Sequence, residues 1–324
     1  MPYIRYKIKP EENKIVEFWK APFFSSKFGS SGTGDGQFQY LAGIAVNNSN
    51  IFVVDQIRAD VQIFDLTGTF VSKFGSYGTG DGQFQDPTGI AVTDSNIYIA
   101  DAGRDDVQIF DLSGTFISKF GKYGTGDGQF QTPTGIAVTD SNIYIVDSVR
   151  DNVQIFDLSG TFVSKFGSSG TGDGQFQIPI GIAVTDSNIY IIDAERDDVQ
   201  IFDLSGTFVS KFGSNGTGDG QFQSPRGMAV INDNLYVLDS ERDDFQIFDL
   251  DGTFISKFGS NGTGDGEFQT PMSIAVDNNN VYVVDSGRDD VQIFSNGLIT
   301  TKTIIVREFC DNSILLKYLN KDGQ

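Results

Sequence analysis

The tripeptide Lys-Phe-Gly occurs six times at an unbroken spacing of 46 residues. Its lysines are Lys27, Lys73, Lys119, Lys165, Lys211 and Lys257. A fixed period of this length, with no insertion or deletion across the intervals, is typical of a repeat architecture in which each repeat forms one supersecondary unit. The repeat therefore restricts the fold strongly, although it says little about a ligand.

Each repeat contains four short apolar runs, which we name strands A to D. In the second repeat they are Gly89 to Val92, Asn96 to Ala100, Val107 to Phe110 and Thr115 to Phe120. The runs are rich in β-branched and aromatic residues, and turn-forming segments separate them, as expected of strands. No window shows the apolar spacing of a helix, so we expect almost no helix.

Strands A and B are apolar at consecutive positions, which indicates a sheet covered on both faces. Such a four-stranded sheet, repeated about every 46 residues, is a propeller blade between two other blades. We therefore predict an all-β, six-bladed β-propeller of four-stranded antiparallel blades with short terminal extensions. Strand A is expected at the inner rim, at about 43–47, 89–93, 135–139, 181–185, 227–231 and 273–277. Strand D is expected at the outer edge, and the phenylalanines between blades.

Four motifs recur along the chain: P-x-G-I-A-V, I-Y-I-A-D, V-Q-I-F-D-L-S-G-T-F-I-S-K-F-G and G-T-G-D-G-Q-F. They span about 270 of the 324 residues, and in them the chain resembles the NHL-repeat family of six-bladed propellers. The resemblance implies the fold. It implies no single activity, because that family includes RNA binders, protein-interaction modules, sensor domains and a few lyases or hydrolases.

The resemblance also implies an asparagine followed by an arginine in the loop between strands B and C. This chain carries an arginine and then an aspartate there, so the basic ring of RNA-binding members is replaced by alternating charges. The arginines are Arg58, Arg104, Arg150, Arg196, Arg242 and Arg288. We expect a girdle of exposed Arg–Asp pairs between adjacent blades.

The chain starts out of phase with the repeat. Ile15 to Gly29 aligns with Val61 to Gly75, so the N-terminus supplies a strand D, with part of a strand C as a further option. We predict that Phe24 to Phe28 pairs with Val291 to Phe294 and completes the sixth blade. The predicted organisation is an N-terminal extension (1–14), a propeller (15–302) and a C-terminal extension (303–324).

The C-terminal segment Leu298 to Phe309 is also strand-like. It is either the sixth blade's own strand D or a fifth outer strand, and Tyr3 to Ile8 is a candidate partner for it. These terminal strands are expected to form an outer closure sheet. The alternative is a contact surface for a partner or for self-association.

The net charge of −20 limits the partners. An acidic body repels nucleic acid phosphates and anionic lipid surfaces, so we expect no nucleic acid partner. Solubility of a repeat protein or a saline habitat would explain the acidity equally. No apolar run is long enough to span a membrane, so membrane insertion is not expected, and the N-terminus lacks the apolar core of a secretion signal. The single cysteine, Cys310, allows no intrachain disulfide, and the compartment stays open.

The chain contains no histidine. This excludes histidine triads, histidine general bases and histidine-ligated zinc. The resemblance includes amidating-lyase-like and antibiotic-lyase-like propellers that rely on histidines, and that chemistry is not expected here.

The glycine-rich G-T-G-D-G-Q-F loop joins strand D of one blade to strand A of the next. It lacks the Lys-Ser/Thr and the helix of a phosphate-binding loop, so no cofactor is expected. Its aspartates are expected to accept hydrogen bonds from loop amides: Asp35, Asp81, Asp127, Asp173, Asp219 and Asp265. A structural divalent cation is an alternative that one aspartate per loop does not indicate.

Differences among the repeats gather at two places. One is the start of strand A, with Tyr40/Ala42, Asp86/Thr88, Thr132/Thr134, Ile178/Ile180, Ser224/Arg226 and Thr270/Met272. The other lies two residues beyond the strand-B aspartate, with Ile57, Gly103, Val149, Glu195, Glu241 and Gly287. Both loops emerge on one face, which predicts a ligand face made by Tyr40, Ala42, Thr88, Thr134, Ile178, Ile180, Arg226, Met272, Ile57, Val149, Glu195 and Glu241. Surface drift is the alternative.

Arg226 is the only base at the start of any strand A. It either anchors an acidic or amphipathic group of a partner or pairs with a neighbouring acid such as Glu195 or Glu241.

Three functions remain in view. The first is a non-enzymatic binding or scaffold propeller for a protein, peptide or glycan. The second is a carboxylate-metal-dependent hydrolase or lactonase, although the near-identical inner strands carry no carboxylate and catalysis needs unlike groups in distinct roles. The third is a structural repeat component of an assembly or surface. No catalytic residue is predicted.

Overall fold

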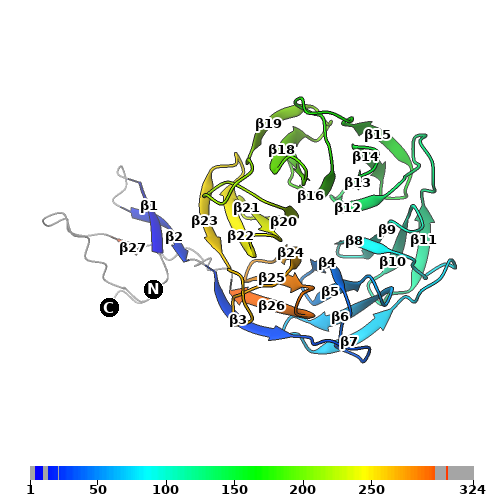
Figure 1. Ribbon diagram of the computed structural model, residues 1–324, viewed down its shortest axis with the longest axis horizontal. Coiled ribbons are helices and arrows are strands. Elements are labelled where there is room, and N and C mark those ends of the chain that lie inside the picture. The colour runs from blue at the N-terminus through cyan, green and yellow to red at the C-terminus, as the bar shows by residue number, and fades with distance from the viewer. Residues whose placement is uncertain (1–3, 10–13, 21, 296–303, 306–324) are drawn as a thin grey trace, which may run out of the picture.

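The computed structural model describes residues 4–9, 14–20, 22–295 and 304–305. All regular secondary structure in these ranges is β-strand. Six four-stranded sheets are arranged as blades around a central axis (Figure 1). In the described part of the chain, no helix could span a membrane. The prediction of an all-β, six-bladed propeller is confirmed.

In blades one to five the chain runs outward through four consecutive antiparallel strands. Blade one contains β4 (Leu41–Val46), β5 (Asn50–Asp55), β6 (Asp60–Asp65) and β7 (Phe70–Phe74). Blade two contains β8 (Pro87–Val92), β9 (Asn96–Asp101), β10 (Asp106–Asp111) and β11 (Phe116–Phe120). Blade three contains β12 (Pro133–Val138), β13 (Asn142–Asp147), β14 (Asn152–Asp157) and β15 (Phe162–Phe166). Blade four contains β16 (Pro179–Val184), β17 (Asn188–Asp193), β18 (Asp198–Asp203) and β19 (Phe208–Phe212). Blade five contains β20 (Pro225–Ile231), β21 (Asn234–Asp239), β22 (Asp244–Asp249) and β23 (Phe254–Phe258).

Strand A begins about two residues earlier than the sequence predicted. In blade two it starts at Pro87, and the register with β9 shifts between Pro87 and Gly89. Proline is tolerated at the first residue of a strand, where its missing N–H removes no ladder hydrogen bond. The proline therefore starts strand A rather than ending the preceding loop.

The hydrophobic core lies between the blades. Each apolar cluster combines residues of two neighbouring blades, such as Val54 and Val61 of blade one with Ile97 and Ile99 of blade two. Phenylalanines fill the outer part of each interface, as predicted. Burial of each such side chain contributes about 1.5–3 kcal/mol, so a blade is stable only against its neighbours.

The ring closes through the N-terminal strand. Blade six contains β24 (Pro271–Val276), β25 (Asn280–Asp285), β26 (Asp290–Ser295) and, as its outer strand, β3 (Phe23–Phe28). The register pairs Phe28 with Val291 and Phe24 with Phe294. Phe28 then lies 4.5 Å, between ring centroids, from Phe64 of blade one. The predicted closure is confirmed.

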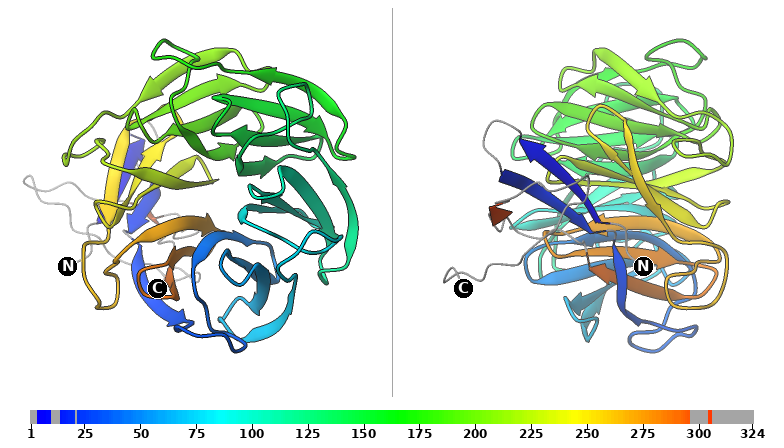
Figure 2. Two further views of the ribbon diagram at one scale, coloured as in Figure 1. Left: turned by 45° about the vertical axis from the view of Figure 1, so that its right-hand side comes forward. Right: turned by 90° about the vertical axis from the view of Figure 1, so that its left-hand side faces the viewer.

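The terminal strands form a separate three-stranded sheet outside the ring (Figures 1 and 2). It contains β1 (Ile4–Lys9), β2 (Lys14–Lys20) and β27 (Ile304–Ile305), with β2 in the middle. Two expectations were therefore wrong: β2 is not part of a strand C, and β1 pairs with β2 rather than with the C-terminal segment. Because β3 is the outer strand of blade six, Leu298 to Phe309 is not that strand. Apart from β27, its residues lie outside the described ranges.

Removal of residues 1–29 should open the ring. We expect the free energy of unfolding to fall by several kcal/mol, because β26 loses its partner and Phe28 no longer covers Phe64. A matched truncation of residues 1–21 keeps β3 and should retain most of the stability. Urea unfolding of the three chains measures the difference. Equal midpoints for the intact chain and the longer truncation would show that β3 does not hold the ring closed.

Candidate functional site

The loops before strand A and between strands B and C meet on one face of the propeller, as predicted. In each blade a backbone N–H at the start of the B–C loop donates to a carbonyl just before strand A. In blade one the donor is Gln56 and the acceptor is Tyr40, at 2.9 Å. This pairing holds the two variable positions of each blade side by side.

Three polar side chains of each blade hold the incoming loop. In blade one, the Asp55 carboxylate accepts from the amides of Gln39 and Tyr40 at 2.7 and 3.3 Å. The Gln62 side chain is fully buried; it accepts from the Gly36 amide and donates to the Gln37 carbonyl, both at 2.8 Å. The sequence analysis missed this glutamine, although a polar residue repeated inside an apolar strand C is itself a signal.

The arginine of the B–C loop also binds the incoming loop. We call Asp55, Arg58 and Gln62, with their equivalents in the other blades, the loop clamp. Arg58 Nη1 donates to the carbonyls of Gly34 and Gln37 at 2.8 and 2.6 Å, and its Nη2 lies 2.8 Å from Asp60 Oδ2. Both side chains of the pair are less than a tenth exposed. The predicted girdle was therefore wrong in two respects: the pairs are buried, and they form within one blade, because the glycine-rich loop folds over the blade that it enters.

The loop aspartates also differ from the prediction. Asp35 Oδ1 lies 2.7 Å from Lys73 Nζ, and each of the other five repeats contains the same Asp–Lys pair. The loop amide is satisfied instead by Gln37 Oε1, which accepts from the Gly34 N–H at 3.0 Å. The Asp–Lys pairs are largely exposed, so each contributes little to stability.

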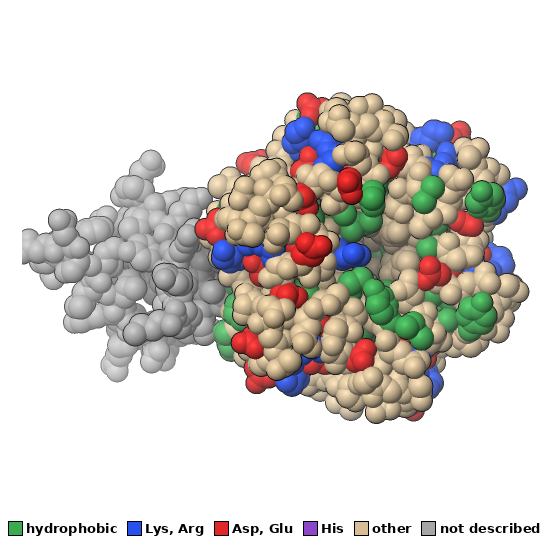
Figure 3. All heavy atoms as spheres, viewed as in Figure 1, with side chains coloured by type: hydrophobic (Ala, Val, Ile, Leu, Met, Phe, Trp, Pro, Cys, Tyr) green, Lys and Arg blue, Asp and Glu red, His purple; other side chains and the backbone are tan. Residues whose placement is uncertain are grey.

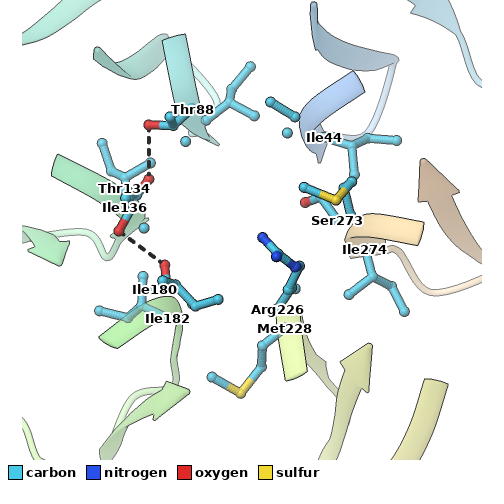
Figure 4. A pocket seen from close by; sticks show the side chains of 18 of the residues that line it. Ile44, Thr88, Thr134, Ile136, Ile180, Ile182, Arg226, Met228, Ser273 and Ile274 are labelled. Atoms are coloured by element: carbon cyan, nitrogen blue, oxygen red, sulfur yellow. Dashed lines mark hydrogen bonds between the residues drawn. The ribbon is translucent and has the colours of Figure 1, made fainter. Parts of the chain in front are cut away.

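A pocket of about 300 Å³ opens on this face at the centre of the ring (Figures 3 and 4). All six strands A line it. Its deeper wall is apolar, with Ile44, Ile90, Ile136, Ile182, Met228 and Ile274. The mouth carries the first variable residue of each strand A, namely Ala42, Thr88, Thr134, Ile180, Arg226 and Met272. The blades thus share one wall and differ at the mouth.

Among the described residues that line the pocket, Arg226 is the only one with a charged side chain. It is exposed, and its Nε donates to Ser240 Oγ at 3.0 Å. Within the described residues it forms no ion pair, so the expected pairing with Glu195 or Glu241 is not observed. Figure 4 shows the guanidinium extending from blade five into the pocket.

The predicted ligand-face residues divide into two groups. Seven line the pocket: Tyr40, Ala42, Thr88, Thr134, Ile180, Arg226 and Met272. Five do not: Ile178, Ile57, Val149, Glu195 and Glu241, which are exposed on the surrounding loops. Sequence reasoning missed Gln56, whose amide donates to Asp86 Oδ1 at the mouth. Its repeat equivalents are alanine or serine, a difference that marked it as variable.

Some carboxylates in the B–C loops and at the start of strand C have raised pKa values. Burial raises the pKa of Asp198 and Asp290 to about 6 despite the paired Arg196 and Arg288. Burial, followed by the charges of Asp147, Asp101 and Asp106, raises the pKa of Asp105 to about 6. Among the described residues, no group of three or more carboxylate or thiol side chains is arranged to hold a metal ion.

From these raised pKa values we predict that the free energy of unfolding decreases as the pH rises from about 4 to about 6. Their folded-state pKa lies above the value near 3.9 of the unfolded chain, so the folded protein binds more protons in this window. The contribution is therefore present at low pH and is lost as pH rises through about 6. Urea unfolding at a series of pH values measures this slope.

Asp105→Asn tests the origin of the slope. Asparagine tolerates the left-handed backbone at this position, where φ is 55°. We expect the variant to be more stable than the wild type at pH 7 and to show a shallower slope. Asp94→Asn, an exposed change on the opposite face, is the control. An unchanged slope in Asp105→Asn would contradict the assignment.

Several solved structures superpose on this chain. A structural genomics protein of unknown function from Bacteroides thetaiotaomicron VPI-5482 superposes with a TM-score of 0.66 at 21% identity, over 85% of this chain and 76% of that one. An auxiliary nutrient binding protein from the same organism gives a TM-score of 0.61 at 15% identity, over 83% and 72%. A streptogramin B lyase gives a TM-score of 0.60 at 13% identity, over 85% and 98%. At these identities the likeness shows the fold alone, and no curated protein matches the sequence.

A family described as "6-bladed beta-propeller" matches the sequence over residues 32–119, 83–142, 124–184 and 219–306. These ranges cover most of the ring and more than half of the chain. With the six observed blades, they show that the chain belongs to this family of six-bladed β-propellers.

Proposed function

We propose that this protein is a non-enzymatic binding propeller of NHL-repeat type. Its ligand face comprises the axial pocket and the surrounding D–A and B–C loops, and its ligand is a protein, peptide or glycan. The proposal rests on the position of the residues that differ among the blades. The clamp of Asp55, Arg58 and Gln62 recurs in the blades, whereas the residues that point into the pocket mouth change from blade to blade.

Exposed apolar side chains on the surrounding loops support the same face. Ile57, Val149 and Ile178 are 62%, 60% and 42% exposed. Each is carried by a loop whose backbone is fixed, so it loses little conformational freedom when a partner covers it. A rim of this kind around a pocket favours a partner that contacts both. The similarly folded protein described as nutrient binding is consistent with a propeller that binds rather than reacts.

Catalysis is the alternative that the likeness to a streptogramin B lyase raises. The pocket lining, as far as the described residues form it, offers no carboxylate, thiol or imidazole to act as a general base or nucleophile. The guanidinium of Arg226 offers N–H donors and no acceptor, so it does not serve as a general base. Incubation with a streptogramin B antibiotic separates the two functions. We expect no conversion of the antibiotic, and turnover that requires the pocket residues would replace binding by catalysis.

The ligand face can be located by a selection followed by footprinting. A random peptide library and a glycan array provide ligands, and hydrogen–deuterium exchange of the full chain locates the bound one. We expect protection at residues 40–42, 56–58, 178–180 and 270–272. The A–B turns at residues 94–96, 140–142 and 186–188 lie at the other end of the blades and should stay unprotected. Protection confined to those turns or to the outer strands would contradict the proposed face.

Ile178→Thr and Met272→Thr then test the contact energetically. Loss of apolar contact area should weaken the selected ligand by about tenfold or more in each variant. Val163→Thr is the matched control, because Val163 is 55% exposed on outer strand β15, away from the ligand face. Equal losses in all three variants would indicate a general effect on the fold rather than a contact.

RNA is not expected to bind. The chain carries a net charge of −20, and each clamp arginine is buried against an aspartate and loop carbonyls. The counterion release that drives non-specific RNA binding is therefore missing. Fluorescence anisotropy with a labelled single-stranded RNA at about 0.15 M salt should detect no complex. Sub-micromolar affinity with a steep salt dependence would contradict this.

A further inference from the structure

We propose that the axial pocket binds a single carboxylate group attached to a small apolar body, with the carboxylate on the two terminal nitrogens of Arg226. This inference rests on the proposed function, since the pocket is the centre of the ligand face. It goes further because it names the chemistry of the ligand and the residue that selects it.

The orientation of Arg226 is the first support. Its Nε is engaged by Ser240 Oγ at 3.0 Å, and that hydroxyl lies 3.2 Å from Ser224 Oγ and 3.3 Å from the Ser224 carbonyl oxygen. One edge of the guanidinium is therefore fixed to blade five. Among the described residues, nothing pairs with Nη1 or Nη2, and Figure 4 shows them directed into the pocket. A guanidinium held in this way presents a planar pair of donors, which suits a carboxylate.

Charge selects a group with one negative charge. In the part of the lining that the structure describes, Arg226 is the only cation, and no acid there neutralises it. The whole chain, however, carries a net charge of −20. A phosphate monoester carries close to two charges at neutral pH, and a single arginine would not offset its repulsion by the acidic body. A carboxylate requires only the one cation.

The opposite wall rejects a second anion. In a six-membered ring, blade two faces blade five, so Thr88 lies across the pocket from Arg226. The Thr88 hydroxyl donates to the Pro133 carbonyl at 3.0 Å, and the Thr134 hydroxyl donates to the Ile180 carbonyl at 3.4 Å. Both hydroxyls have used their protons on neighbouring backbone, so they offer only lone pairs to a ligand. That wall accepts an N–H or O–H group of the ligand and repels a carboxylate.

The remaining walls are apolar. Ile180 and Met272 flank Arg226 at the mouth, and the isoleucines of the deeper wall lie beneath them. A volume of about 300 Å³ is at the small end of the usual range for small-molecule pockets. The body that carries the carboxylate must therefore be compact and apolar. Two sources supply such a group: a free short-chain carboxylic acid, or the C-terminus of a peptide that ends in an apolar residue.

Isothermal titration of the full chain with matched probes tests the proposal. The probes are hexanoate, hexanamide and hexyl phosphate, together with Ala-Ala-Leu bearing a free or an amidated C-terminus. We expect wild-type protein to bind hexanoate and the free-acid peptide, and to bind the amides and the phosphate at least about tenfold more weakly, since charge-assisted hydrogen bonds are lost or repulsion is added. A peptide that binds more tightly than hexanoate identifies a peptide terminus as the source; the reverse order identifies a free acid.

Three variants test the role of Arg226. Two of them introduce a residue that other repeats carry at the equivalent position. Arg226→Thr introduces the threonine of blades two and three and should weaken hexanoate by at least about tenfold without affecting hexanamide. Lys122→Ser removes one exposed positive charge two residues after outer strand β11, away from the pocket lining, at a position where the other repeats carry serine. This variant should bind hexanoate like the wild type. Arg226→Lys keeps the charge without the planar fork and should be intermediate. Unchanged melting temperatures confirm that all variants fold.

The inference would be overturned by equal binding of hexanoate and hexanamide, by hexanoate binding that survives Arg226→Thr, or by no binding of either carboxylate at millimolar concentration. Tighter binding of hexyl phosphate would overturn the assignment of a singly charged group. A peptide or glycan that protects the ligand face but binds equally well to Arg226→Thr would overturn this inference and leave the proposed function intact. Protection elsewhere on the ring would remove the proposed function itself.

Discussion

The pairing of β3 with β26 is the interaction on which the rest of the propeller depends. It joins residues from opposite ends of the chain and supplies the outer strand of blade six. Within the described ring, no blade has a core of its own, because each apolar cluster takes about half of its residues from the next blade. An open ring would therefore expose two apolar faces at once. The axial pocket exists only in the closed ring, since all six blades line it.

A repeated polar clamp divides the surface into fixed and variable positions. Asp55, Arg58 and Gln62 each hydrogen-bond the backbone of the loop that enters the same blade, and Arg58 also pairs with Asp60. These groups are buried, so loss of one would leave an unsatisfied partner at a cost of about 1–3 kcal/mol. The side chains at positions 42 and 57 and at their equivalents take no part in this clamp. Differences among the blades are therefore tolerated on the ligand face, next to a backbone that the clamp keeps rigid.

The strands and the ring closure could be predicted because both follow from local pattern and phase. Apolar runs bounded by turn residues gave the strands, and the offset of Phe24 to Phe28 gave the closing pair. The polar contacts could not be predicted as well, because they depend on where a loop folds. The sequence places Arg58 and Asp60 together but does not show that the loop at Gly34 and Gln37 covers them. Similarly, Lys73 is 38 residues from Asp35, and only the folded loop brings them within 2.7 Å.

The candidate site shows the same division. Variation among the repeats identified Arg226, Ile180 and Met272, and topology placed them on one face. The pairing of Arg226 with Ser240 rather than with an acid could not be foreseen. Ser240 and Glu241 are adjacent in the same B–C loop, and the sequence does not show which of the two side chains turns toward Arg226. Gln62 and Gln56 were missed for opposite reasons. Gln62 is the same in every repeat and was taken as part of strand C, whereas Gln56 differs from its equivalents but lies one residue before the position that was compared.

The two parts of the ligand face make different demands on a ligand, and together they favour a peptide terminus over a free acid. A short carboxylic acid fills the pocket but leaves Ile57, Val149 and Ile178 exposed to water. A peptide whose C-terminal carboxylate lies on Arg226 extends outward past the mouth, where its preceding residues can cover those side chains. Its backbone N–H groups also supply the donors that Thr88 and Thr134 can accept. Binding of this kind combines a carboxylate contact with Arg226 in a rigid pocket and apolar contact with the surrounding loops. A ligand that makes only one of these two contacts covers only a fraction of the ligand face.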